Sequence, residues 1–569
     1  MHRLFQCDFQ EAQTAGLPAS SGPKPAVALI AAALGLLITA CGGGSGSVPT
    51  PPLVPTSYVL TVNSTNPASG VSISVGSPYN NVVELVTTPF TETAASGSQY
   101  LLLAPSKSGA NTFSNWTGCT STTTTTCSVT LNANTTVTAN YTVPVAPAVT
   151  YYVSGTGSDS NDGLSTGTAF LTLQQAANVT QPGDIVLVMN GTYTNSCTGC
   201  DVLNVATPGT ANAWITYKAY PGQTPKISFN GWAGIFFSPT AAYIEVNGFT
   251  VLGNNYNVTL QQAQNQSTTT PDPTFNGNCI SADGRAGTAT VRPHHIRILN
   301  NIIGACGGGG IGTAWSDYVT ISGNTIYDSA WYSIYGASGI STWENWNYDN
   351  STGYRMIITG NRLFGNQEQI PVFSDGQITD GEAIIVDSTR NSAYQPSIGL
   401  PPYTGRTLIA NNVIYNNGSS AIEVFQSDHV DVVNNSTFRD VFVPVLSGRG
   451  EMFLNQTSDV NVVNNIFSSL TGQNPVDSVP GTTSSIRLDY NLYFNGKIGG
   501  DVPSGPNDLF ADPLYIDPAD ANRLNVQLTV SPTSPAEGSG TPTLAPTTDF
   551  AGNPRPGSKG YDRGAYQQP

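Results

Sequence analysis

Six heptapeptides with one shared pattern decide the fold, namely HIRILNN (295–301), YVTISGN (318–324), RMIITGN (355–361), RTLIANN (406–412), HVDVVNN (429–435) and DVNVVNN (459–465). Each ends in Asn, and the positions five and three before that Asn are mostly aliphatic, which is the period-two alternation of a half-buried strand. The closing asparagines are separated by 23, 37, 51, 23 and 30 residues. A basic coil of 23 residues with variable insertions is the repeat that a parallel β-helix needs.

The composition agrees with an all-β solenoid. The 569 residues include 59 Gly and 39 Pro but only 10% charged residues, which disfavours coiled coils and helical solenoids. At 39% hydrophobic residues the chain can bury a large core. With 20 Lys and Arg against 36 Asp and Glu, the net charge of −16 excludes a basic nucleic-acid footprint. We expect a right-handed parallel β-helix whose turns carry Asn side chains that hydrogen-bond from coil to coil.

The N-terminus predicts export. Residues 26–40, AVALIAAALGLLITA, form an apolar run that is short for a membrane span and fits the core of a signal peptide over 1–40. The run ends directly before Cys41 and GGGSGS, and this arrangement resembles the lipobox of bacterial lipoproteins. The resemblance implies lipidation of Cys41 and, because Gly42 follows, an anchor in the outer membrane. The alternative is an ordinary secretory signal with an incidental cysteine.

The six cysteines of the mature chain beyond Cys41 fall in close pairs: Cys119 with Cys127, Cys197 with Cys200, and Cys279 with Cys306. An even number of cysteines in an exported chain predicts disulfides. The CTGC segment at 197–200 is also compatible with a redox or zinc half-site, but no second CxxC supports that interpretation.

Composition also predicts the domain boundaries. A Gly/Ser/Pro tether spans 41–57, a small β domain of short alternating strands spans 58–143, and a Pro-rich linker spans 144–149. The small domain contains FSNWTGC and closes on VTLNANTTVTANY, and it resembles the internalin-type B repeat of bacterial surface proteins. That resemblance implies a spacer or adhesive unit without catalytic function.

The β-helix is expected over 150–540, with caps at both ends because a solenoid end exposes unpaired backbone. The segment that contains GSDSNDG and PGDIVLVMNGTY resembles the N-terminal cap of pectate-lyase-like β-helices, with one short helix between the two motifs. The tail over 541–569 contains DFAGNPRPGSKGYDRGAYQ and resembles a C-terminal motif of secreted β-helix proteins.

The two longest intervals mark loops inserted into consecutive coils, and such loops often carry function. They are STWENWNYDNSTG (341–353) and VDSTRNSAYQPSIGLPPYTG (386–405). The aromatic side chains expected to stack on sugar rings are Trp343, Trp346 and Tyr403 of these loops, together with Phe425 of the next coil. The alternative is that these rings only pack the loops.

A second set of strands carries carboxylates on its outward side. The Ile residues of Cys279-Ile280, Gly310-Ile311, Gly339-Ile340, Ala383-Ile384 and Ala421-Ile422 align and are expected to point inward. Asp387 and Glu423 then occupy neighbouring outward positions on adjacent coils, about 4.8 Å apart along the stack. Asp380 and Glu382 precede Asp387 in ITDGEAIIVD.

A polar column is expected at one corner, six positions before each ladder Asn. Its members are His295, Tyr318, Arg355, Arg406, His429 and Asp459. The plain interpretation is an exposed strand start. The functional interpretation places Arg406 and His429, with Arg390 from the inserted loop, beside the carboxylates as a base or a substrate clamp.

Two reactions compete for these residues. A uronan lyase needs a cation, for which Asp380, Glu382 and Asp387 would bind Ca²⁺, and a base. Resemblance to β-helix polysaccharide lyases implies Lys or Arg as the base, yet no Lys occurs between Lys226 and Lys497. A glycoside hydrolase needs two carboxylates, which Asp387 with either Glu423 or Asp380 would supply. An acidic solvated face without function is the third possibility.

We therefore expect a monomeric, surface-anchored, polysaccharide-active enzyme, either lyase or hydrolase, that works in a groove between Asp380 and Glu423. Its partners are a glycan and, through Cys41, a membrane. The alternative is a non-catalytic adhesin or glycan-binding lipoprotein, because one fold hosts both kinds of function.

Overall fold

The computed structural model describes residues 57–77, 80–144, 147–391 and 399–569. The described chain divides into two compact units, one on each side of position 145/146. The predicted signal peptide, Cys41 and most of the tether lie outside the described residues. No helix in the described ranges is long and apolar enough to cross a membrane.

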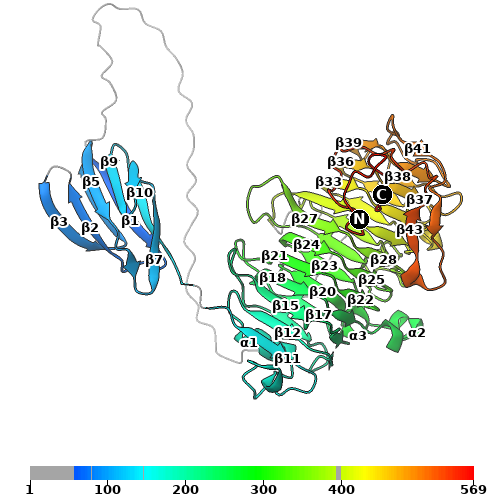
Figure 1. The fold of residues 1–569 in the computed structure, drawn as a ribbon, viewed down its shortest axis with the longest axis horizontal. Coiled ribbons are helices and arrows are strands. Elements are labelled where there is room, and N and C mark those ends of the chain that lie inside the picture. The colour runs from blue at the N-terminus through cyan, green and yellow to red at the C-terminus, as the bar shows by residue number, and fades with distance from the viewer. Residues whose placement is uncertain (1–56, 78–79, 145–146, 392–398) are drawn as a thin grey trace, which may run out of the picture. The chain divides into compact units, whose positions relative to one another are not determined.

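The smaller unit consists of two five-stranded sheets that enclose their own core, built around Leu60, Ile73, Leu102, Val129 and Val137 (Figure 1). The first sheet has the order β4-β1-β10-β7-β6, with bounds Phe90–Ala95, Ser57–Thr65, Thr135–Thr142, Asn111–Thr117 and Lys107–Ser108. The second has the order β3-β2-β5-β9-β8, with bounds Asn80–Thr87, Ser72–Ser77, Ser98–Leu103, Thr126–Leu131 and Ser121–Thr123.

The larger unit is a parallel β-helix, as the heptapeptides predict (Figure 1). The coils contribute strands to three long sheets of eleven, eleven and nine strands, which we call sheets 1, 2 and 3. Sheet 1 contains β11 (Thr150–Val153), β12 (Ile185–Val188), β15 (Ile215–Ala219), β18 (Ala242–Asn247), β21 (His294–Leu299), β24 (Asp317–Ser322), β27 (Tyr354–Thr359), β30 (Arg406–Ala410), β33 (Asp428–Val433), β36 (Ser458–Val463) and β39 (Ser484–Asp489).

Sheet 2 contains β13 (Thr192–Tyr193), β16 (Lys226–Ser228), β19 (Thr250–Leu252), β22 (Ile302–Gly304), β25 (Thr325–Tyr327), β28 (Arg362–Phe364), β31 (Val413–Tyr415), β34 (Ser436–Phe438), β37 (Ile466–Ser468), β40 (Leu492–Phe494) and β41 (Leu509–Phe510). Sheet 3 contains β14 (Leu203–Val205), β17 (Ala233–Phe237), β20 (Asn278–Asp283), β23 (Ile311–Ala314), β26 (Ile340–Trp343), β29 (Ile384–Asp387), β32 (Ile422–Phe425), β35 (Met452–Asn455) and β38 (Val476–Ser478).

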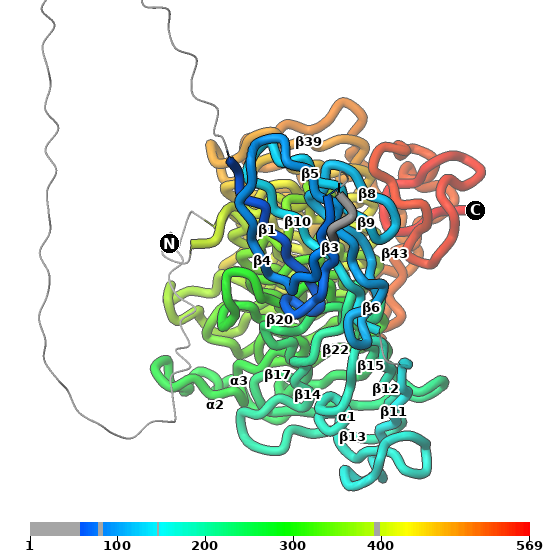
Figure 2. Tube along the Cα trace, turned by 90° about the vertical axis from the view of Figure 1, so that its left-hand side faces the viewer, coloured from blue at the N-terminus to red at the C-terminus, as the bar shows by residue number. Residues whose placement is uncertain are grey.

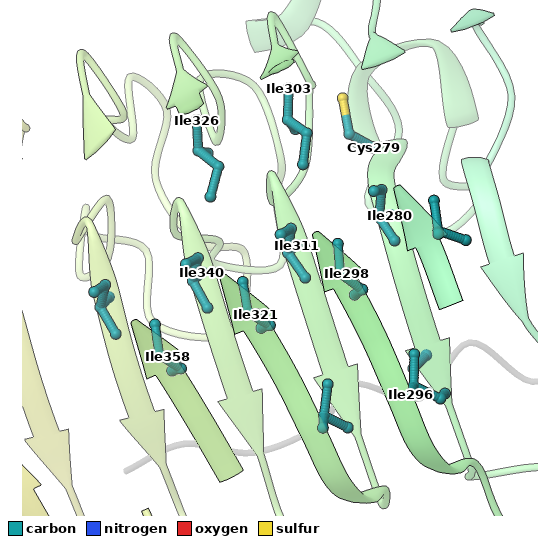
Figure 3. Close-up of a cluster of buried hydrophobic side chains, with 14 of the residues drawn as sticks. Cys279, Ile280, Ile296, Ile298, Ile303, Ile311, Ile321, Ile326, Ile340 and Ile358 are labelled. Carbon is teal, nitrogen blue, oxygen red and sulfur yellow. The ribbon is translucent and has the colours of Figure 1, made fainter. Parts of the chain in front are cut away.

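The interior of the stack is filled by aliphatic side chains in register. Ile296 pairs with Val319 and Ile298 with Ile321 across neighbouring strands of sheet 1, and all four are fully buried. Figure 3 shows these isoleucines pointing between the sheets toward Ile311 and Ile340 of sheet 3. The predicted inward and outward alternation of the heptapeptides is therefore confirmed.

The asparagine ladder is also present. Asn301 donates from its backbone N–H to Oδ1 of Asn324 at 2.9 Å and from Nδ2 to the same oxygen at 3.0 Å. The same paired contact repeats from Asn324 to Asn361 and onward through Asn412, Asn435, Asn465 and Asn491. Each side chain thus satisfies buried backbone groups at a turn that would otherwise lack partners.

The residue before each ladder asparagine has a left-handed backbone, with φ between 54° and 69° at Asn300, Gly323, Gly360, Asn411, Asn434 and Asn464. Only Gly and, less readily, Asn adopt this conformation at low cost. This requirement explains why the heptapeptides end in Asn-Asn or Gly-Asn.

A second, shorter ladder lies at the turn between sheets 2 and 3. Asn366 donates to Oδ1 of Asn417, and Asn417 donates from N and Nδ2 to Oδ1 of Asp440 at 2.7 Å. The backbone N–H of Asp440 donates to Oε1 of Glu451 at 3.0 Å, and both carboxyl groups are fully buried. Burial raises the pKa of Asp440 to about 7 and that of Glu451 well above its usual value.

Short helices and the C-terminal segment cover the stack. α1 (Leu173–Val179) is N-capped by Thr172, whose hydroxyl accepts a hydrogen bond from the N–H of Gln175. The helix buries apolar side chains near the first strands (Figures 1 and 2). The remaining elements are α2 (Leu260–Gln264), α3 (Pro273–Asn276), η1 (Thr166–Thr168), η2 (Asn255–Asn257), η3 (Pro444–Leu446), η4 (Arg523–Asn525), β42 (Tyr515–Asp517) and β43 (Gln527–Val530).

The three predicted disulfides are formed. They join Cys119 with Cys127, Cys197 with Cys200, and Cys279 with Cys306, with Cα atoms 5.2 to 5.6 Å apart. Cys279 and Cys306 are buried, so the third disulfide lies inside the β-helix.

Replacing Asn412 with Ala should destabilise the β-helix strongly. The change removes the acceptor of Asn361 and leaves the carbonyl of Ile358 without its donor, inside a fully buried turn. Unpartnered groups of this kind predict a loss of about 3–5 kcal/mol in the free energy of unfolding, measured by urea denaturation. Thr320→Ala on the outward side of β24 should cost less than about 0.5 kcal/mol, and equal losses would contradict the ladder's role.

The Asp440–Glu451 pair predicts a pH-dependent stability. Between the unfolded pKa of about 4 and the folded pKa, the folded state binds more protons than the unfolded state, so the free energy of unfolding falls as pH rises through this window. Asp440→Asn keeps the acceptor for Asn417 and removes one ionisable group. It should therefore unfold at higher urea than wild type at pH 8 but not at pH 4.5, whereas Asp517→Asn at an exposed position should change neither midpoint. If wild type and Asp440→Asn have the same urea midpoint at both pH values, the predicted effect of the Asp440–Glu451 pair on stability is wrong.

Candidate functional site

The outward side of sheet 3 carries the candidate site. Because side chains alternate along each strand, the partners of the buried Ile and Val residues face outward. The outward residues are Ser281 and Asp283 of β20, Gly312 and Ala314 of β23, Ser341 and Trp343 of β26, Ile385 and Asp387 of β29, Glu423 and Phe425 of β32, Phe453 and Asn455 of β35, and Asp477 of β38. This face thus holds aromatic rings and carboxylates.

Asp387 lies between two of the rings. The ladder aligns it with Trp343 on one neighbouring coil and with Phe425 on the other. Its Oδ1 accepts from the hydroxyl of Ser388 at 2.7 Å. Trp343 and Asp387 are half-buried and Phe425 is 9% exposed, so the row alternates ring, carboxyl and ring along the stack.

Glu423 lies one coil further and is aligned with Ile385. Strand spacing and rise place the Cα atoms of Asp387 and Glu423 roughly 8 Å apart. Oε2 of Glu423 accepts from Nη1 of Arg449 at 2.5 Å. The same Nη1 donates to Oε1 of Glu382 at 2.6 Å, so one guanidinium bridges two buried carboxylates.

Glu382 is fully enclosed by donors. Ser338 donates to its Oε2 at 2.7 Å, while Ser419 and Arg449 donate to its Oε1. A buried carboxylate with this set of donors keeps its orientation. Glu382 therefore holds Arg449 in place beneath Glu423.

Two further carboxylates enter from the long turn before β29. Glu368 is buried, and its Oε2 accepts from the N–H groups of Thr379 and Asp380 at 2.9 and 3.1 Å. The hydroxyl of Thr379 donates to Oδ2 of Asp380 at 2.6 Å. Within the described chain Oε1 of Glu368 has no hydrogen-bond partner.

Burial raises the pKa values of two acids in this cluster, and for one of them nearby carboxyl groups add to the effect. Burial raises the pKa of Asp387 to about 8, and the charges of Asp380, Glu344 and Glu382 raise it further, against the hydrogen bond from Ser388. Burial likewise raises the pKa of Glu344 to about 7, although Trp315 donates to it at 2.8 Å. Asp387 is therefore a carboxylic acid that keeps its proton at neutral pH, a property that is common at catalytic sites.

Burial also raises the pKa of Glu423 well above its usual value, while Arg449 opposes this shift and Glu382 adds to it. Glu382 and Glu423 share one guanidinium beside Asp387. A proton donor and a second carboxyl group, which is ion-paired with Arg449, thus lie on adjacent coils.

The structure separates three predicted residues from this cluster. Arg390 pairs with Asp428 at 2.7 Å. Arg406 pairs with Asp431 and Asp459, and His429 contacts Asp459 at 2.6 Å. The expectation that Arg406 and His429 face the carboxylates is wrong in geometry, because the corner that they share belongs to sheet 1 and supplies its own acids.

Two predicted sugar platforms are buried. Tyr403 is 4% exposed, and its hydroxyl donates to Oδ1 of Asp317 at 2.7 Å beside the fully buried Arg355–Asp317 ion pair. Trp346 is 7% exposed. Both rings hold the inserted loops against the coils, so the expectation that they present a face to a ligand is corrected. Trp343 is half-buried and remains a candidate platform, whereas Phe425, at 9% exposed, stays a prediction that rests on its place in the outward row of Asp387.

One residue of the predicted calcium set already has hydrogen-bond partners. Both oxygens of Glu382 accept hydrogen bonds, from Ser338 at one oxygen and from Ser419 and Arg449 at the other. Over the described ranges no group of three or more His, Cys, Asp or Glu is arranged to hold a metal ion. No step below passes through a cation, and Ca²⁺ at Asp380, Glu382 and Asp387 stays a prediction.

Sequence reasoning missed Arg449, Glu368 and Glu344. The sequence does contain a signal for Arg449. The interval between Asn435 and Asn465 is 30 residues instead of 23, so it contains an insertion, which is shorter than the other two. Glu368 lies in the turn between sheets 2 and 3, whose length is merged with that of the second loop in the interval of 51. Only the fold shows which turn each insertion occupies.

A separate cavity of about 270 Å³ lies on sheet 2, away from the carboxyl cluster. Tyr327, Phe364 and the segment 521–524 line it. Arg523 of this segment donates to both carboxylate oxygens of Asp328 at 2.6 Å. This bidentate ion pair attaches the C-terminal segment to the coils.

Comparisons with known proteins give structural likenesses only. No protein-family profile matches the chain, and no curated protein matches its sequence. The chain is similar to the crystal structure of pectate lyase Pel9A at 13% identity, with 75% of this chain and 98% of that chain covered and a TM-score of 0.41. A GH136 lacto-N-biosidase from Eubacterium ramulus is similar at 13% identity over 64% of this chain and 67% of that chain, with a TM-score of 0.40.

A mannuronic acid-specific polysaccharide family 6 lyase from human gut microbiota is similar at 14% identity over 59% of this chain and 76% of that chain, with a TM-score of 0.32. The assignment of a parallel β-helix rests on the chain's own strand ladders.

Arg449→Gln should destabilise the protein at neutral pH and much less at acid pH. Without the guanidinium, Glu382 and Glu423 are buried carboxylates with no counter-ion, which predicts a loss of about 3–5 kcal/mol in the free energy of unfolding at pH 7. Protonation relieves the loss at pH 4.5. Urea denaturation at pH 7 and pH 4.5 measures the loss of stability and its relief by protonation. Arg439→Gln, at an exposed position, is the control. A pH-independent loss would show that Arg449 acts by packing alone.

Proposed function

We propose that this protein is a glycan-active enzyme, and specifically a glycoside hydrolase whose centre is the carboxyl cluster of sheet 3. The proposal rests on the positions of two outward carboxyl groups on adjacent coils, Asp387 and Glu423. Asp387 is flanked along the stack by Trp343 and Phe425. A glycosidase needs one carboxylic acid and one carboxylate on either side of the bond that it cleaves.

The two carboxyl groups are suited to different roles. Asp387 keeps its proton at neutral pH because it is buried among other acids, so it can protonate the oxygen of the leaving sugar. Glu423 contacts Arg449, whose positive charge opposes the effect of burial on the pKa of Glu423, so Glu423 is the candidate base or nucleophile. The Cα separation of roughly 8 Å is compatible with two carboxyl groups that flank one glycosidic bond.

The rings bind and orient the glycan. Trp343 and Phe425 occupy the same outward row as Asp387 on its two neighbouring coils, so a sugar chain that runs along the stack contacts a ring on each side of the acid. Aromatic faces are large apolar surfaces that suit the apolar face of a pyranose ring. The row therefore positions a glycosidic bond over Asp387.

Lyase chemistry has less support in this arrangement. A uronan lyase needs a base beside the reacting carbon, and no Lys occurs between Lys226 and Lys497. Arg449 contacts two carboxylates, and Arg390 and Arg406 are paired with acids elsewhere. The hydrolase needs none of these side chains as a base.

We also propose that the chain is exported and anchored through Cys41. Three disulfides, one of them inside the β-helix, support an oxidising compartment.

Asp387→Asn and Glu423→Gln should each lower kcat by at least about 10³-fold, because each removes one partner of the acid–carboxylate pair. Wild-type activity should fall as the pH rises above about 8, where Asp387 loses its proton. Reducing ends released from a panel of polysaccharides measure the activity, and Asp477→Asn on the same outward face is the matched control.

Products that absorb in the ultraviolet would contradict the hydrolase and favour a lyase. Glycan binding without any product on a broad panel would favour a non-catalytic adhesin. Unchanged activity of Asp387→Asn would remove Asp387 from the mechanism.

A further inference from the structure

Carboxyl groups outnumber basic side chains around the proposed centre. The outward residues of sheet 3 from β20 to β38 include four carboxylates, Asp283, Asp387, Glu423 and Asp477, but no Lys, Arg or His. The preceding turn adds Glu368, Asp380 and Glu382, and Glu344 follows β26. A glycan chain on this face therefore passes carboxyl groups on β20, β29, β32 and β38.

The nearby arginines do not provide a positive site. Arg285 pairs with Asp283 at 2.5 Å and Arg390 with Asp428 at 2.7 Å. Arg449 pairs with both Glu382 and Glu423, and its side chain is 19% exposed. Each guanidinium is thus balanced by at least one carboxylate, so a further anion gains little attraction from any of them.

We propose that the site accepts uncharged glycans and rejects polyuronates, an inference that rests on the proposed function and names its substrate class. A uronan carries a carboxylate on every sugar, and each would approach a face on which carboxyl groups outnumber arginines and the arginines Arg285, Arg390 and Arg449 are already ion-paired. The rings of Trp343 and Phe425, by contrast, favour a neutral pyranose. The specificity arises from repulsion as much as from attraction.

Direct binding tests this inference separately from catalysis. Hexasaccharides of galacturonate and mannuronate are titrated calorimetrically into the full-length protein, beside neutral hexasaccharides of galactose, xylose, glucose and N-acetylglucosamine. We expect at least one neutral hexamer to bind at least tenfold more tightly than either uronate. Equal or tighter binding of a uronate, or no binding of any neutral hexamer, would overturn the inference.

A gain of affinity provides the second test. Ser341 is a half-buried outward residue of β26 that pairs with Ile385, beside Trp343. Ser341→Arg places a guanidinium in the row of Glu423 and should tighten hexagalacturonate binding at least tenfold at low salt. Ser281→Arg introduces the same charge two coils away, on β20, and should change the affinity less than threefold. Equal effects of the two variants would contradict a local rejection of anions.

The failures of the two proposals are distinguishable. If Asp387→Asn binds the neutral hexamer and still cleaves it at the wild-type rate, the mechanism is wrong and the charge selection stands. If the wild type cleaves a polyuronate in preference to every neutral glycan, and Asp387→Asn abolishes this cleavage, the centre is correct and the selection is wrong.

Discussion

The hydrogen bond between the side chain of one asparagine and the turn of the next coil is the constraint on which the β-helix depends. Every coil must change direction three times, and each turn leaves backbone groups that no neighbouring strand can pair. From Asn324 to Asn491 the amide oxygen accepts from the backbone and the side chain of the preceding coil's asparagine. Since these groups are fully buried, the ladder fixes both the position of the turn and the register of the strands that follow.

The register in turn determines what the outward face can do. Coils held at one spacing bring side chains from distant parts of the sequence into straight rows, as Trp343, Asp387 and Phe425 show. Insertions occur at the turns, where they add residues without disturbing the ladder. Glu368, Asp380, Glu382 and Arg449 all enter the carboxyl cluster from turns, so the rigid strands supply the acid and the carboxylate while the turns set their charge.

Several buried ionisable groups of this protein are either ion-paired or have a raised pKa. Arg355 with Asp317 and Arg449 with Glu382 are charges paired inside the protein, where each side chain has several hydrogen-bond partners. Asp387 and Asp440 lack a basic partner in the described contacts, and their pKa values rise to about 8 and about 7 instead. At Asp440 the raised pKa affects stability, whereas at Asp387 the half-buried carboxyl faces outward, where a raised pKa is useful for chemistry.

The sequence by itself determined the solenoid, the ladder, the disulfide pairs and the outward positions of Asp387 and Glu423 on adjacent coils, because these depend on short periods and on residue types with few alternatives. Left-handed turns require Gly or Asn, and buried strands require alternating aliphatic residues, so the pattern appears directly in the heptapeptides. Only the tertiary structure decided which charges meet. Arg390, Arg406 and His429 are close in sequence to the carboxylates but pair with Asp428, Asp431 and Asp459, whereas Arg449 reaches Glu382 from 67 residues away. Charged side chains are long and their partners are set by the lengths and paths of the turns, which no local pattern encodes.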